Sequence, residues 1–143
     1  MGREYPDVPI TGATAVVIRD GKVLLVRRRN EPGAGKWSLP SGTQELGEDL
    51  RDTARREVLE ETGITCTVGE LVYAYDVIER AADGRVRYHF VLVGFLAAWV
   101  SGEPVAGDDA DRAEWVPHDE ALARIVWPDV RETIRRALIQ NSQ

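Results

Sequence analysis

Residues 42–64 read GTQELGEDLRDTARREVLEETGI, and this stretch decides how the rest of the chain is interpreted. Its pattern turns helical at Glu48, and we expect a helix from there to Thr62. Acidic Glu48 and Asp49 suit the start of a helix, where the macrodipole favours negative charge. Gly63 suits the position just past a helix end, because glycine adopts the left-handed conformation that stops the helix.

Three glutamates of this helix fall where apolar side chains are expected. The buried stripe, plotted at about 100° per residue, consists of Leu50, Ala54 and Val58. Glu57 and Glu61 fall inside that sector or at its edge, and Glu60 lies beside Glu57. Burying an unpaired charge is expensive, so a helix that only needed solubility would not place carboxylates there.

Two interpretations of these acids follow from the helix alone. Residues at i, i+3 and i+4 share one face, so the three carboxylates converge and repel one another unless a cation lies among them. Oxygen ligands of this kind suit Mg²⁺ or Mn²⁺. The alternative is a solvated acidic face with ordinary salt bridges to Arg55 and Arg56.

The wider spacing favours the metal interpretation. The chain reads Gly-x5-Glu-x7-Arg-Glu-Val-x-Glu-Glu-x-Gly-Ile, which resembles the signature of the Nudix hydrolases, where two positions take any bulky aliphatic residue. The nine matching positions are Gly42, Glu48, Arg56, Glu57, Val58, Glu60, Glu61, Gly63 and Ile64.

The resemblance implies a role for each side chain that matches the motif. Glu57, Glu60 and Glu61 match the family's metal-binding and catalytic acids. The implied chemistry is attack of water on a phosphorus of a diphosphate, with Mg²⁺ offsetting charge on the phosphoryl oxygens.

The remaining motif residues are implied to support these acids. Arg56 matches the arginine that braces the glutamates, and Glu48 the acid that helps to fix the geometry between loop and helix. Gly42 is expected to let the backbone turn into the loop, and Gly63 to end the helix.

Working outward, the other segments fit an α/β (α+β) fold, with a mixed sheet between helices in an α/β/α sandwich. We expect hairpins over Ala13–Arg29 (around Asp20-Gly21) and Glu70–Trp99, a loop over Glu31–Gly47, a strand over Glu114–Val116, and helices over His118–Arg124 and Asp129–Gln140. No repeat or linker divides the sequence, so we expect one domain over residues 1–143, of which residues 42–64 are the Nudix box.

Several residues outside the box are candidates for substrate contacts. Arg27 or Arg28 is a candidate phosphate clamp, with an exposed strand end as the alternative for each. Trp37 is a candidate base-stacking residue, with packing as the alternative. Nudix enzymes often take a further metal ligand or a catalytic base from the loop near Asp108 and Asp109; here Asp109 is the candidate catalytic residue, with a solvated acidic loop as the alternative.

Composition restricts the partners and the compartment. A net charge of −6 counts against binding a nucleic-acid backbone, which needs a basic face, so an RNA-end hydrolase is a weaker alternative. No stretch has the length of a membrane span, and we expect no membrane partner. A lone cysteine, Cys66, fits a reducing, cytoplasmic compartment. The oligomeric state stays open, with a homodimer as one alternative.

The resemblance also suggests a substrate class. Residues 88–93 and the Ala106–Ala110 loop are similar to those of small ADP-ribose and nucleotide-sugar pyrophosphatases, which implies a small nucleotide substrate and release of a nucleoside monophosphate and a sugar phosphate. A house-cleaning nucleoside triphosphate pyrophosphohydrolase is one alternative. A catalytically silent nucleotide-binding Nudix module is another, and the intact box glutamates count against it.

Overall fold

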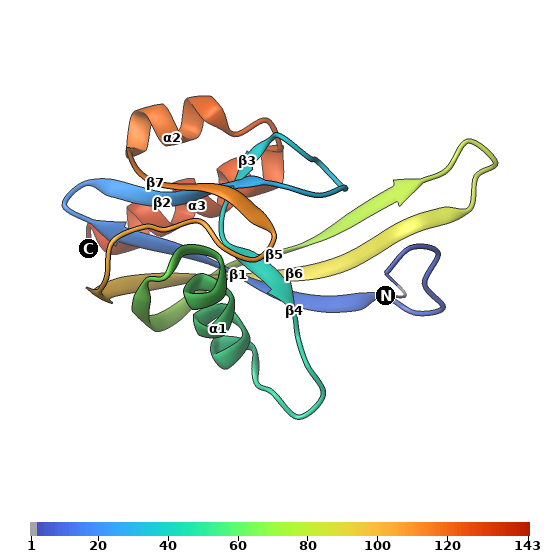
Figure 1. Ribbon diagram of the computed structural model, residues 1–143, viewed down its shortest axis with the longest axis horizontal. Coiled ribbons are helices and arrows are strands. Elements are labelled where there is room, and N and C mark those ends of the chain that lie inside the picture. Colours follow the sequence, from blue (N-terminus) through green and yellow to red (C-terminus); the bar gives the residue numbers. More distant parts are fainter. Residues whose placement is uncertain (1–2) are drawn as a thin grey trace.

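A computed structural model describes residues 3–143 as a mixed sheet with helices on both faces (Figure 1). The strands are β1 (Ile10–Arg19), β2 (Lys22–Arg28), β3 (Trp37–Ser38), β4 (Ser41–Thr43), β5 (Thr65–Arg80), β6 (Val86–Ser101) and β7 (Ala110–Pro117). The helices are α1 (Leu50–Thr62), α2 (His118–Arg124) and α3 (Pro128–Asn141). The expected sandwich is therefore confirmed. Among the described residues, none of the helices combines the length and apolarity needed to cross a membrane.

Strand β1 is the centre of the sheet because it pairs with three neighbours. It runs parallel to β6 along most of its length and antiparallel to β2 and β4. Its C-terminal end meets β2, whereas Gly12–Thr14 near its N-terminal end meets β4. The chain around β4 is thus held against the middle of the sheet, directly before α1.

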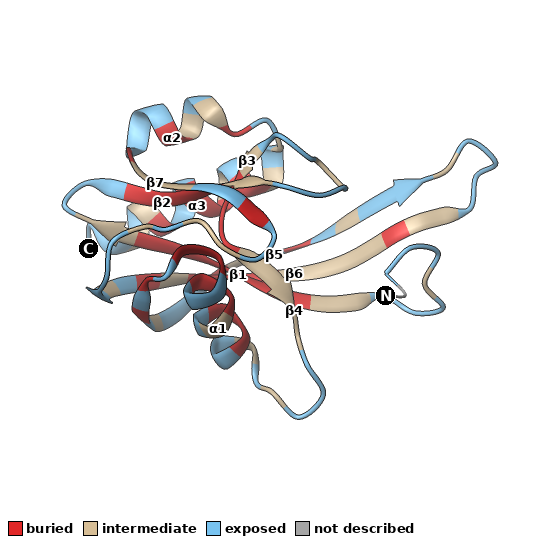
Figure 2. Ribbon diagram, viewed as in Figure 1, coloured by how far each residue is buried: buried red, intermediate tan, exposed pale blue. Residues whose placement is uncertain are grey.

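Alternation along β1 divides the core into two layers. Ala13, Ala15 and Val17 are buried on the face that packs against Ala54 and Val58 of α1. Val16 points to the opposite face, where it joins a cluster that contains residues of α2 and α3. Figure 2 shows this burial concentrated in the sheet and on the inner side of α1. Both faces are therefore closed by helices.

The first hairpin has the turn that the sequence predicts. Asp20 and Gly21 have φ of 49° and 74°, the positive values that a type I′ turn requires. The expected loop over Glu31–Gly47 is wrong in part, because it contains β3 and β4. These strands exist through pairing with β2 and β1, which no local pattern indicates. The strands β5 and β7 are also longer than expected.

Helix α1 ends as predicted. Gly63 is its C-cap with φ 72°, and its backbone N–H donates to the Leu59 carbonyl. We expect Gly63→Ala to lower the free energy of unfolding by about 1 kcal/mol, because a Cβ is unfavourable in this conformation. Chemical denaturation measures the change. Gly63→Asn is the matched control and should retain most of the stability, since asparagine tolerates left-handed φ; equal losses in both variants would contradict the conformational explanation.

Candidate active site

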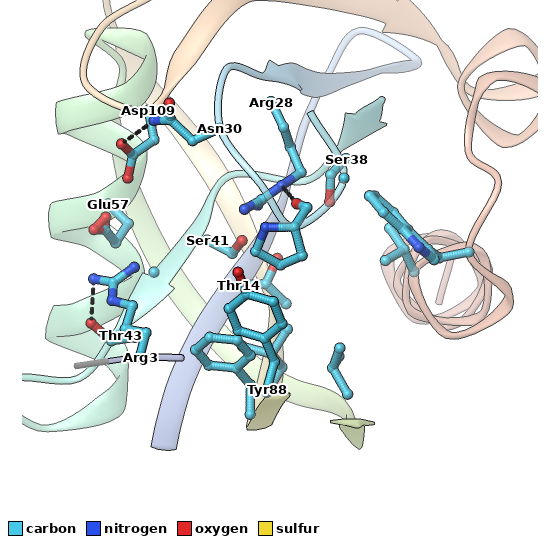
Figure 3. A pocket seen from close by; sticks show the side chains of 18 of the residues that line it. Arg3, Thr14, Arg28, Asn30, Ser38, Ser41, Thr43, Glu57, Tyr88 and Asp109 are labelled. Atoms are coloured by element: carbon cyan, nitrogen blue, oxygen red, sulfur yellow. Dashed lines mark hydrogen bonds between the residues drawn. The ribbon is translucent and has the colours of Figure 1, made fainter. Parts of the chain in front are cut away.

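A cleft of about 990 Å³ opens between α1 and the N-terminal end of α3. Figure 3 shows side chains from β1, β4, α1, β6 and the loops before β3 and β7 directed into it. Glu57, Glu60 and Glu61 of α1 line the cleft together with Asp108 and Asp109 of the loop before β7. The three box glutamates therefore do converge on one cavity, together with two acids of the loop.

Close packing fixes where the Glu57 carboxylate lies. Gly42 is in strand β4 and pairs with Ala13, and a Cβ added to Gly42 would overlap the carboxyl group of Glu57. A glycine is required at position 42 as expected, but the expected reason, a turn of the backbone, is wrong. The glycine is needed because any side chain there would occupy the volume that the acid fills.

Arg56 joins the acids to the strand before the helix. Its guanidinium donates to both carboxylate oxygens of Glu48, at 2.7 and 2.9 Å, and to the carbonyl of Thr43 at 3.0 Å. It also donates to Glu60 at 2.8 Å and to Glu57 at 3.2 Å. These hydrogen bonds lower the pKa of Glu48 to about 2. The bracing role implied for Arg56 and Glu48 agrees with this geometry.

Glu57 and Glu61 of the helix are compensated less than Glu48 is. Glu57 and Glu61 are 7% and 5% exposed. Burial raises the pKa of Glu57 to about 7, with Arg56 opposing and Glu60 and Asp108 adding to the rise. Burial, with a further contribution from Glu57, raises the pKa of Glu61 to about 9. Their charged forms are thus unfavourable unless a cation is present.

The donor set fits a divalent cation. Carboxylate oxygens of Glu57, Glu60 and Asp108 lie within 4.8 Å of one another. The Oε2 atom of Glu57 is buried and has no hydrogen-bond partner among the described residues. Buried polar atoms are nearly always satisfied, and a cation held by this carboxylate cluster would satisfy the Glu57 oxygen. Glu61 lies beside this trio, where it accepts a 3.4 Å hydrogen bond from the Ser41 backbone.

The loop that carries Asp108 is attached to the end of α1. The backbone N–H groups of Val105 and Gly107 donate to the carbonyls of Thr62 and Glu61, at 2.9 and 3.0 Å. These are orphan carbonyls of the last helical turn, which need partners from outside the helix. Next along the loop, Asp109 lines the cleft and accepts a 3.1 Å hydrogen bond from Asn30.

Of the three candidate substrate contacts, Arg28 lines the cleft, whereas Arg27 and Trp37 do not. Arg28 lines the cleft, but Arg27 does not and instead pairs with Asp111 at 2.8 Å. The pairing of β2 with β7 shifts its register between these two arginines. Trp37 is also absent from the described lining; it packs against the core beneath the Arg124 guanidinium. The packing alternative therefore describes Trp37.

Other lining residues escaped the sequence analysis. They are Arg3 and Trp127, which lies directly before α3. The stacked rings of Tyr88 and Phe90 also line the cleft, and they belong to the stretch 88–93 on which the suggested substrate class rests. The aromatic residue just before a helix-opening Pro128 was an available signal for Trp127. Nothing local in the sequence indicates Arg3, since its position depends on how the N-terminal segment folds back.

Comparison with known families agrees with the fold and the site. The model of the NUDIX domain matches residues 9–137. The chain therefore belongs to the Nudix family.

Individual relatives carry different activities in their names. An ADP-ribose pyrophosphatase from Methanocaldococcus jannaschii is 35% identical over 111 residues, covering 78% of this chain. The chain spans 62% of that relative's length. An oxidized purine nucleoside triphosphate hydrolase from Danio rerio is 30% identical over 121 residues, covering 80% of this chain and 70% of the relative.

A solved structure has the same fold. The crystal structure of a MutT NUDIX hydrolase from Burkholderia pseudomallei superposes with a TM-score of 0.74 at 31% identity, covering 91% of this chain and 98% of that one.

We expect Arg56→Lys to damage catalysis through geometry rather than through charge. Lysine keeps the positive charge but cannot form the two parallel hydrogen bonds to Glu48. The value of kcat should fall by about 10-fold or more, with a smaller change in KM, in steady-state kinetics on the preferred nucleotide. A change confined to KM would indicate that Arg56 touches substrate.

In the metal-free protein we expect Glu61 to make stability fall as pH rises. Its pKa is raised to about 9 in the folded protein from an ordinary value of 4.5. Its contribution to the free energy of unfolding is therefore fully present below about pH 4.5 and is lost as the pH rises toward 9. The loss is at most about 1.4 kcal/mol per pH unit. Thermal unfolding with a chelator from pH 5 to 8 measures it. Glu61→Gln should give a flatter curve and a more stable protein at pH 8; parallel curves would contradict the assignment.

Proposed function

We propose that this protein is a metal-dependent hydrolase of the phosphate–phosphate bond in a nucleoside diphosphate linked to another group. The observation that carries the proposal is the buried, unpartnered Oε2 of Glu57 within a cluster of carboxylates. A cluster held in this way suits a hard cation, and Mg²⁺ or Mn²⁺ prefers such oxygen ligands. Glu57, Glu60 and Asp108 would hold the ion, with Glu61 beside them.

The chain's own residues have distinct roles in this proposal. Bound at these carboxylates, a divalent cation offsets negative charge on the phosphoryl oxygens. Arg56 keeps Glu57 and Glu60 in place, and Arg28 contacts a phosphate from the opposite rim. Asp109 orients the attacking water and accepts its proton while the bond between phosphorus and the bridging oxygen breaks. Asn30 holds Asp109 in position.

The cleft supports a substrate with bulky organic groups. It extends from the acids of α1 to Trp127 on one wall and to Tyr88 and Phe90 on another. Aromatic faces of this kind suit bases and sugar rings. Together with the relative named as an ADP-ribose pyrophosphatase, this favours ADP-ribose or a nucleotide sugar, cut to a nucleoside monophosphate and a sugar phosphate.

A nucleoside triphosphate is the second candidate substrate. It is favoured by the relative named as an oxidized purine nucleoside triphosphate hydrolase, which has the better mutual coverage. The box acids suit the phosphates of either substrate, so the preference between the two depends on the residues of the cleft walls.

The proposal also includes the cellular compartment of the protein. The free thiol of Cys66 is buried, and burial raises its pKa to about 11, so it is kept as an unreactive thiol. A protein with such a thiol as its one cysteine suits the reducing cytoplasm.

The test compares kcat/KM for ADP-ribose, a nucleotide sugar, ATP, GTP and 8-oxo-dGTP at matched Mg²⁺ and pH. We expect ADP-ribose or the sugar nucleotide to lead. A triphosphate ahead by tenfold, equal to about 1.4 kcal/mol, would replace the first candidate with the second.

The same assay tests the metal site. Glu57→Gln should lower kcat by at least ~100-fold while the circular dichroism spectrum stays unchanged, because the variant keeps the volume and loses the charge. Asp52→Asn is the matched control, an exposed carboxylate of the same helix that does not line the cleft. Near-parental activity of Glu57→Gln at saturating Mg²⁺ would refute the metal site.

A further inference from the structure

The segment before β1 folds back as an arm over the β5–β6 hairpin. We define the N-terminal arm as residues 3–9. The Tyr5 N–H donates to the Arg87 carbonyl at 2.7 Å, and the Glu4 carboxylate pairs with the Arg87 guanidinium at 2.9 Å. The Arg85 guanidinium lies 4.3 Å from the centre of the Tyr5 ring. Three different interactions thus attach two successive residues to Arg87 of β6 and to Arg85 just before that strand.

The backbone of the arm also adopts an uncommon conformation. Tyr5 has φ of 51°, in the left-handed region that bulky residues rarely occupy. Such a conformation persists only where surrounding contacts compensate for it, and its occurrence is associated with functional positions. The contacts of Tyr5 and Glu4 with β6 supply that compensation. The arm is therefore held in one conformation, which fixes the direction in which Arg3 points.

That direction is into the cleft. A guanidinium N–H of Arg3 donates to the Thr43 hydroxyl at 2.9 Å, and Arg56 donates to the carbonyl of the same threonine. Figure 3 shows the Arg3 guanidinium beside Thr43, below Glu57. Arg3 and Asp109 thus lie on opposite sides of Glu57 in the same cleft, although the two are more than a hundred residues apart in the chain.

The charge of the cleft indicates what Arg3 does there. Acidic side chains outnumber basic ones in the described lining, whose cations are Arg3, Arg28, Lys36 and Arg56. Arg56 is occupied by Glu48, Glu57 and Glu60. Arg28 and Lys36 come from the rim formed by the end of β2 and the loop after it. The divalent cation proposed at the acids offsets part of the charge of an anionic substrate, and Arg3 adds a side-chain cation on the α1 side of the same cleft.

A purely structural role for Arg3 is less consistent with its contacts. Within the described part of the chain its guanidinium makes one side-chain hydrogen bond, to a neutral hydroxyl, and remains exposed. A guanidinium has five N–H donors in a fork that matches phosphate oxygens. Most of those donors are therefore available to a ligand.

We propose that the N-terminal arm presents Arg3 as a binding residue for the diphosphate of the substrate. This rests on the proposed function of the cleft. The arm would act as a preformed wall, since its contacts with β6 do not involve the guanidinium of Arg3. Arg3 and Arg28 would then contact the anion from opposite rims.

Steady-state kinetics on the preferred nucleotide test the proposal. Arg3→Gln should raise KM by about 5- to 10-fold with kcat changed by less than about 3-fold, because the contact serves the ground state and the transition state alike. Arg3→Lys should fall between the parent and Arg3→Gln. Arg55→Gln, an exposed arginine of α1 paired with Asp52 outside the cleft, is the matched control and should behave as the parent.

A binding measurement gives a readout that does not depend on turnover. Calorimetry with adenosine 5′-(α,β-methylene)diphosphate and Mg²⁺ should show a Kd raised to a similar extent in Arg3→Gln. Tyr5→Ala should weaken binding by releasing the arm, and the double variant should bind no more weakly than Arg3→Gln alone.

Different outcomes separate this proposal from the one on which it rests. If the parent turns over nucleotides and Arg3→Gln leaves KM and Kd unchanged, the role of Arg3 is wrong and the cleft's function stands. A fall in kcat at constant KM would also overturn the binding role, since it would mean that Arg3 acts through Thr43. A parent that hydrolyses none of the nucleotides tested would refute the proposed function, and this proposal with it.

Discussion

The hydrogen-bonded pair of Arg56 and Glu48 is the interaction on which the site depends. It joins the middle of α1 to the loop before the helix, while the same guanidinium holds the Thr43 carbonyl of β4. Because the hydrogen bonds from Arg56 lower the pKa of Glu48 to about 2, the Glu48 carboxylate is charged at neutral pH and offsets part of the Arg56 charge. What remains for Glu57 is one 3.2 Å hydrogen bond, and its other oxygen has no partner among the described residues. The pair therefore positions the acids of the proposed metal site without neutralising them.

This arrangement makes one helix serve two opposing purposes. The apolar side of α1 closes the core through Ala54 and Val58, which are almost completely buried. Glu57 and Glu61 of the same helix are nearly as buried, so the charged forms that the proposed metal site requires are costly there. Folding of the metal-free chain must tolerate that cost, and a bound cation removes it. Cation binding at the proposed site would therefore raise the free energy of unfolding, by an amount set by the affinity for the cation.

The sequence predicted the features that local spacing determines. The convergence of Glu57, Glu60 and Glu61 follows from helix periodicity, and the turn at Asp20-Gly21 from its φ requirement. The features it missed depend on distant pairing. Strand β4 exists because it pairs with β1, and Arg28 rather than Arg27 enters the cleft because of the register of β2. The prediction that Trp37 contacts substrate failed for the same reason. The packing of α2 and α3 decides that the Trp127 ring, and not the Trp37 ring, faces the cavity.

The parts of the site that are distant in sequence share α1 as their reference. The β6–β7 loop is bonded to the carbonyls of Glu61 and Thr62, so the helix itself sets where Asp108 lies. The strand before the helix is set by Arg56 through Thr43, and the Arg3 side chain bonds to that same threonine. Groups that would contact phosphate are therefore fixed relative to the acids. Residues that would contact the base or sugar lie elsewhere: Trp127 directly precedes α3, and Tyr88 belongs to the long β5–β6 hairpin (Figure 1). Substitutions in those two elements can change the preferred nucleotide while the arrangement around the scissile diphosphate stays the same.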